Sequence, residues 1–174
     1  MAHHHPPMDF VLEYAAGALP VAQSACVAAH LSYCQRCRQL VDRLEDVGGA
    51  HLERLDPQPV GESVLESVMA RLDDPEPLRY APNEVSDTQL PGLLDRLING
   101  NYADLAWKRV TQSLSISYLK TGDPSHEFAL YRIAEGGRIP EHTHGGSEMT
   151  LVLRGGFADE SGEYHQGDFL VREG

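Results

Sequence analysis

The sequence predicts an α+β protein of more than one domain, in which a small helical half precedes an all-β half built as a barrel or jelly roll. Apolar residues recur at helical spacing up to about residue 72, whereas short runs with a period of two begin near residue 105. Between them lies a stretch rich in proline and acidic residues, which is typical of a linker. The predicted domains are residues 1–74 for the helical half, 75–100 for a linker with a short helix, and 101–174 for the β half.

The composition indicates which classes of molecule the protein binds and in which cellular compartment it lies. The 174-residue chain carries a formal net charge of −12 and has no basic patch, so we expect neither direct nucleic-acid binding nor binding to a membrane. An acidic surface suits a basic protein partner instead. Three cysteines are too few for a disulfide-rich secreted scaffold, and no apolar run resembles a signal peptide or a membrane span. The sequence therefore predicts a cytoplasmic protein with reduced thiols.

Three helices are predicted in the N-terminal half. The first covers residues 8–18, and the second runs from Pro20 to about Val47, where Gly48-Gly49 would end it. The third, residues 62–72, has the clearest amphipathic pattern. Its apolar stripe consists of Val64, Leu65, Val68, Met69 and Leu72. This stripe would either complete the local core or dock on a partner, and the pattern leaves both interpretations open.

A candidate metal site lies in the second of these helices, with the pattern His30-x3-Cys34-x2-Cys37. On one α-helix, offsets of four and seven residues bring the three side chains to one face. Two thiolates and an imidazole are three of the four ligands of a tetrahedral zinc site. The alternatives are a redox Cys-x2-Cys pair and a buried helix with two inert cysteines. Cys26, one turn before His30, would be a spare ligand or redox partner, although a small core residue is the favoured interpretation.

The β half contains a second candidate metal site. Strands are predicted at residues 107–110, 114–119, 127–133, 149–153, 157–159 and 169–171. His142 and His144 would point to the same face of a strand, and Glu148 would return on the next strand. Two imidazoles and a carboxylate suit a divalent ion such as Zn, Fe, Ni or Mn.

Glycines around these residues make the pattern more specific. The spacing matches the first sequence motif of the cupin fold at Gly136, His142, His144, Glu148 and Gly155. A second cupin motif begins at Gly167-Asp168, but the sequence stops before the His that would supply a fourth ligand. We therefore expect a cupin that lacks its last strands, with three protein ligands and open positions on any metal.

A His-Cys-Cys motif followed by a cupin resembles the ChrR family of zinc-dependent anti-sigma factors. The resemblance covers nearly the whole chain. The matching pieces are Tyr14-Ala15-Ala16-Gly17, residues 30–37, residues 142–155 and residues 157–168.

This resemblance implies a function and a fuller set of ligands. The helical domain would bind an extracytoplasmic-function (ECF) sigma factor and keep it from RNA polymerase. A His near the N-terminus would complete the zinc site; His5 has the expected distance before Tyr14, with His3 and His4 close by. The cupin would hold a divalent metal, zinc in the family, sense singlet oxygen or organic peroxide, and release the sigma factor. The protein would then be a regulator of the oxidative stress response and not an enzyme.

Two other functions fit parts of the pattern. A small dioxygenase-like cupin metalloenzyme with a helical appendage would use the open metal positions for O2 chemistry. A thiol-switch anti-sigma factor would join Cys34 or Cys37 to Cys26 on oxidation and expel zinc. Substrate turnover that is lost in His142→Ala would identify the first, and an oxidant response unchanged in Cys26→Ala would exclude the second.

Overall fold

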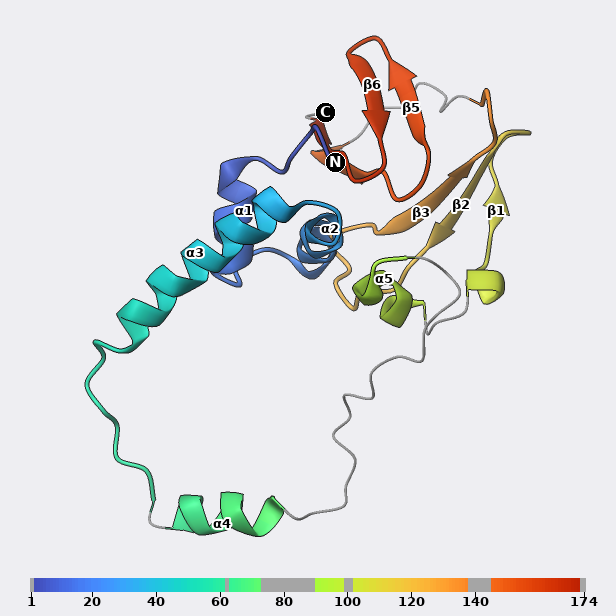
Figure 1. The fold of residues 1–174 in the computed structure, drawn as a ribbon. Coiled ribbons are helices and arrows are strands. Elements are labelled where there is room, and N and C mark those ends of the chain that lie inside the picture. The colour runs from blue at the N-terminus through green and yellow to red at the C-terminus, as the bar shows by residue number, and fades with distance from the viewer. Residues whose placement is uncertain (1, 62, 73–89, 99–101, 138–144, 173–174) are drawn as a thin grey trace.

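The computed structural model of the chain describes residues 2–61, 63–72, 90–98, 102–137 and 145–172. Three helices lie together at the N-terminal end, a fourth stands apart from them, and a small helix leads into the strands (Figure 1). The predicted order of helices followed by a β-rich domain is confirmed.

The first two helices each begin directly after a proline. They are α1 (Met8–Ala15), which follows Pro7, and α2 (Val21–Leu31), which follows Pro20. Proline suits this place because its φ is fixed and the first N–H groups of a helix have no partner within the helix. The next helix, α3 (Gln35–Leu52), packs against α1 and α2.

The prediction of a single helix from Pro20 to about Val47 was wrong, because the chain turns between α2 and α3. The N–H groups of Tyr33 and Cys34 both donate to the carbonyl of His30, at 2.9 and 3.1 Å. Cys34 is extended, with φ −117° and ψ 104°, and its thiol accepts from the N–H of Cys37. A side-chain acceptor at this position starts a new helix in place of continuing the old one.

The glycine pair in α3 does not end the helix as predicted. Gly48 and Gly49 lie inside it, and it continues to Leu52. Both glycines are exposed, so their weak helix preference costs stability without forcing a stop.

The fourth helix, α4 (Ser63–Arg71), confirms the predicted helix over residues 62–72 but buries none of its residues. Figure 1 shows it well away from the other elements. The short helix α5 (Gly92–Leu97) follows and packs against α2. It corresponds to the short helix predicted before the β half.

Antiparallel strands form the β half. The strands β1 (Lys108–Arg109), β2 (Leu114–Tyr118) and β3 (Ala129–Ile133) make one sheet in that order. A second pair joins β4 (Glu148–Leu151) to β7 (Phe169–Arg172), and a third joins β5 (Gly156–Asp159) to β6 (Gly162–His165). Every predicted strand is present within the described residues, and β6 is an addition.

The two halves share a hydrophobic core. Cys26 and Val27 of α2 pack with Leu19 and with Phe169 of β7, and partly buried residues of both halves surround them. The division at residues 74 and 100 stays a prediction, because this core contains residues from both sides of it. None of the helices in the described part of the chain is long and apolar enough to cross a membrane.

Candidate metal centre

One cluster of four side chains has the composition of a metal site. The ligand atoms of His5, His30, Cys34 and Cys37 all lie within 4.8 Å of one another. Three of these residues are buried and His5 is half-buried. Sequence reasoning named all four, and the structure brings them together.

The four residues come from three segments of chain. His30 lies in the last turn of α2, whereas Cys34 caps α3 and Cys37 lies in its first turn. His5 belongs to a segment before α1 that is neither helix nor strand, residues 3–5, which we call the N-terminal arm. The prediction that one helix face carries His30, Cys34 and Cys37 was therefore wrong. The turn between α2 and α3, and not helical periodicity, brings them together.

The distances within the cluster fit a tetrahedral ion. His30 Nε2 lies 3.3 Å from Cys37 Sγ, and His5 Nδ1 lies 3.4 Å from Cys34 Sγ and 3.5 Å from Cys37 Sγ. A tetrahedron with ordinary zinc–sulfur and zinc–nitrogen bond lengths has N···S edges of about 3.5 Å. The donors therefore surround a space of the right size, and two thiolates with two imidazoles are a closed donor set of the structural type.

The tautomer of His30 is set by a backbone carbonyl. His30 Nδ1 donates to the carbonyl of Gly167 at 2.7 Å. A carbonyl only accepts hydrogen bonds, so the proton lies on Nδ1 and the lone pair of Nε2 faces Cys37. Metal-binding imidazoles commonly have such a partner on the other ring nitrogen.

Burial sets the charge states before any ion binds. It lowers the pKa of His30 and of His5, and the Arg36 guanidinium lowers the pKa of His5 further. Both rings are therefore neutral near pH 7, the state that a metal needs. Burial, together with a hydrogen bond from the Cys37 thiol to Cys34, raises the pKa of Cys37 to about 12, so an ion must displace the proton of that thiol. The N-terminal end of α3, where Cys34 is the cap and Cys37 lies in the first turn, favours the resulting negative charge.

The other histidines of the arm have a different role from His5. His3 and His4 donate hydrogen bonds from their backbone N–H groups to the carboxylate of Asp168. The family resemblance did not predict this contact, and it did not decide which of the three histidines is the ligand. Burial raises the pKa of Asp168, but hydrogen bonds from the N–H groups of His165, His4 and His3 outweigh burial and leave it below its ordinary value.

Cys26 is a core residue. Its side chain is 8% exposed within the shared hydrophobic core, and burial raises the pKa of its thiol to about 12. The thiol is therefore protonated and inert near neutral pH, as the favoured interpretation of the sequence held.

The second predicted site lies mostly outside the described residues. His142 and His144 fall in the segment 138–144, so the cupin metal site stays a prediction. Glu148, its third member, is half-buried at the start of β4, opposite Arg172 of β7.

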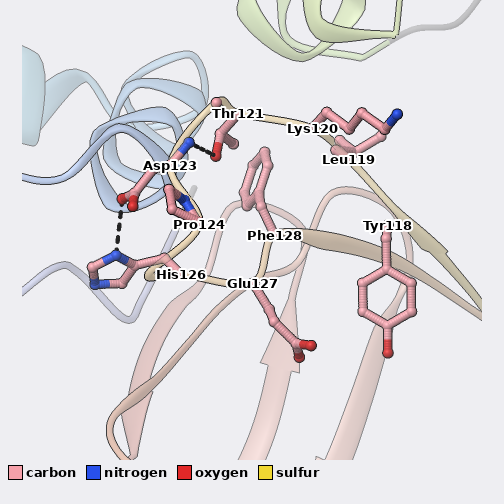
Figure 2. A pocket seen from close by; sticks show the side chains of 10 residues that line it. Tyr118, Leu119, Lys120, Thr121, Asp123, Pro124, His126, Glu127 and Phe128 are labelled. Atoms are coloured by element: carbon pink, nitrogen blue, oxygen red, sulfur yellow. Dashed lines mark hydrogen bonds and ion pairs between the residues drawn. The ribbon is translucent and has the colours of Figure 1, made fainter.

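Two hollows lie in the described surface. One, of about 410 Å³, is lined by residues 118–124 and 126–128, from the end of β2 to the segment before β3. Figure 2 shows His126 turned toward Asp123. This hollow contains none of the four clustered residues. The other, of about 330 Å³, is lined by residues that include His4, His5, Tyr164 and Phe169, and it opens beside the metal cluster.

Comparison with known proteins agrees with the fold. Residues 96–173 match the family model described as the ChrR cupin-like domain. The chain is 35% identical over 170 residues to the anti-sigma-E factor ChrR of Cereibacter sphaeroides, which covers 98% of this chain and 79% of that protein. It also resembles a chain in the crystal structure of Rhodobacter sphaeroides SigE in complex with the anti-sigma ChrR. The TM-score is 0.84 at 33% identity, covering 99% of this chain and 88% of that one. The chain therefore belongs to the ChrR family of anti-sigma factors.

Proposed function

We propose that this protein binds zinc at His5, His30, Cys34 and Cys37 and sequesters an ECF sigma factor, which it releases on an oxidative signal received by its β half. The observation that carries the proposal is the four-residue cluster in a chain similar to ChrR from a SigE–ChrR complex. Singlet oxygen or an organic peroxide is the proposed signal, and His142, His144 and Glu148 are the proposed ligands of a second divalent ion, zinc as in the first site.

Zinc would join the N-terminal arm to the α2–α3 turn. The unit formed by α1, α2 and α3 is small, and domains of this size commonly need such a cross-link because their hydrophobic core is small. Bound zinc neutralises the two thiolates and fixes four side chains, while the helices supply the surface for the partner. Loss of the ion would loosen α1 relative to α2 and α3.

The proposed docking surface is the apolar face of α4. Its side chains stay largely exposed, from 46% for Val64 to 70% for Leu65. An amphipathic helix with an uncovered apolar face is suited to lie in a hydrophobic groove of a partner. The residues of this face are Val64, Leu65, Val68 and Met69 of α4, together with Leu72 directly after the helix.

A binding experiment with matched variants tests the docking surface. The full chain and a purified ECF sigma factor of the SigE type would be mixed and their affinity measured by calorimetry. Val68→Asp should weaken binding by 100-fold or more, because it places a charge in the buried interface. Ala70→Asp, which adds the same charge to the opposite face of α4, should change affinity by less than about threefold. Equal losses in both variants would contradict the assignment of the surface.

The regulatory part has its own test. A transcription assay with the sigma factor, core polymerase and this protein should show repression that singlet oxygen or an organic peroxide relieves. The full chain with His142→Ala and His144→Ala should still repress but should no longer respond to the signal. Repression that responds normally in that variant would exclude the cupin ligands as the sensor.

A further inference from the structure

We infer that the Gly167-Asp168 turn of the β half is a positioning element of the metal centre, because it holds both histidine ligands and so couples the β half to the metal. Gly167 holds His30 directly, and Asp168 holds His5 through the N-terminal arm. This inference rests on the proposed zinc site, since without a metal the turn would only join two parts of the fold.

Asp168 is the anchor of the arm. Its side chain is fully buried, with an exposed fraction of 0%. One carboxylate oxygen accepts from the backbone N–H of His3 at 2.6 Å and of His4 at 3.0 Å, and the other accepts from that of His165 at 2.8 Å. Hydrogen bonds to a carboxylate are about twice as strong as neutral ones. The arm is thus fixed at the residues directly before His5.

A backbone bond in the opposite direction completes the attachment. The N–H of Phe169 donates to the carbonyl of His4 at 3.0 Å. His4 is therefore held through both its N–H and its carbonyl, one residue before the proposed ligand. The position of His5 depends on this turn more than on α1, which starts three residues later.

Gly167 does the same for the second histidine. Its carbonyl accepts from His30 Nδ1 at 2.7 Å. The glycine has φ +91°, and a Cβ there would lie 2.8 Å from the Cβ of Tyr33 in the α2–α3 turn. Only glycine allows the two turns to approach this closely. Its carbonyl is thereby brought to the imidazole.

The coupling runs in both directions. Partners of metal-bound histidines typically change metal affinity by 10- to 100-fold when they are removed. Linkage is reciprocal: a change that displaces the Gly167-Asp168 turn lowers metal affinity, and loss of the metal destabilises the position of the turn by the same free energy. The turn thus gives the β half a direct physical route to the centre that holds the helices together.

The test measures zinc release to a chelator from the full chain. Asp168→Asn replaces one acceptor oxygen by an N–H donor and removes the charge, so zinc should leave 10- to 100-fold faster. The matched control is Asp159→Asn. Asp159 also accepts two backbone N–H groups, those of Ser161 and Gly162 in the β5–β6 turn, and it forms an ion pair with Arg172 of β7. Unlike Asp168, it accepts no hydrogen bond from the arm among the described residues. The rate of zinc release from Asp159→Asn should stay within twofold of the wild-type rate.

A double variant separates positioning from general stability. In the His5→Ala background, Asp168→Asn should add no more than twofold to the release rate, because the ligand through which it acts is gone. Multiplicative effects of the two substitutions would overturn the inference. So would release from the single Asp168→Asn variant at the wild-type rate.

Hydrogen exchange of the wild-type protein keeps the inference testable if Asp168→Asn does not fold. Removal of zinc should speed amide exchange both in residues 3–5 and in residues 165–169, with no change in the β5–β6 turn. Unchanged exchange at residues 165–169 would overturn the coupling. A purified wild-type protein without zinc would instead overturn the proposed zinc site, and the inference with it.

Discussion

Two helices of the N-terminal half, α2 and α4, both carry apolar side chains but lie in opposite environments. Most residues of α2 are buried against α5, the β4–β7 pair and the metal cluster. No residue of α4 is buried. The comparison shows that apolar residues make a helix able to pack against other elements, but that packing occurs only where neighbouring elements are present. The hydrophobic and metal contacts around α2 are expected to give a stabilised unit, and α4 is expected to be free for a partner.

The largest expected effect is loss of the metal cross-link around α2. The full chain with Cys34→Ala and Cys37→Ala should bind no structural zinc and should lose the fixed packing of α1, α2 and α3. Structural zinc contributes about 10–16 kcal/mol in zinc-finger peptides. Metal analysis and the protease resistance of the helical half are the measurements. Cys26→Ala is the control and should retain stoichiometric zinc; resistant helices in the double variant would contradict the role of the cluster.

The same valine-to-alanine substitution should change the stability of the protein more in α2 than in α4, because only the α2 valine is buried. Val27 of α2 has an exposed fraction of 0%, whereas Val64 of α4 has 46%. Val27→Ala should lower the free energy of unfolding by about 2–3 kcal/mol through lost burial and a cavity. Val64→Ala, the same change at an exposed site, should alter it by less than about 0.5 kcal/mol. Urea unfolding of the zinc-loaded protein measures both, and equal values would mean that α4 is covered in the free protein.

The pH dependence of zinc affinity tests the metal cluster beside α2, which α4 lacks. Burial raises the pKa of Cys37 to about 12, so zinc must expel a proton from this thiol at any pH near neutral. His5 and His30 have lowered pKa values and lose no proton there. Zinc affinity should therefore rise with pH, by at least about tenfold per unit between pH 7 and 9. Chelator competition measures this slope, and an affinity that is flat over this range would argue against thiolate ligation.

The smallest expected effect lies in α3. Gly48 sits inside the helix, and a Cβ placed there would meet no atom within 4 Å. Gly48→Ala should therefore stabilise the zinc-loaded protein by about 0.5–1 kcal/mol. Thermal unfolding measures the change. A loss of stability would show that the surroundings of Gly48 are tighter than the structure describes.

Residue patterns predicted the order of helices and strands well, because amphipathic spacing and glycine-rich turns are local signals. The helix break at Tyr33 was missed because no proline or glycine marks it; the Cys34 thiol, read as a ligand, also caps α3. The four clustered residues were nonetheless named, three from spacing and His5 from the family resemblance.

The contacts of Gly167 and Asp168 could not be foreseen in the same way. Their partners in the arm and in α2 lie more than 100 positions away in the sequence, and no local pattern specifies such a pairing. The one available signal was an acidic residue after a glycine in a predicted turn, which cupins use for their own second motif. Only the folded arrangement shows this carboxylate turned toward the arm.

The contact between His3 and Asp168 spans a separation of 165 residues, and this has a consequence for synthesis. Domains fold as they leave the ribosome, N-terminal segments first, and contacts of high sequence separation form late because loop closure must come first. The arm therefore cannot reach its anchor until synthesis has passed residue 168. A nascent or truncated chain that ends before residue 168 would present its cysteines without a fixed arm. Synthesis of the Gly167-Asp168 turn is thus needed before the arm at the other end of the sequence can be fixed in place.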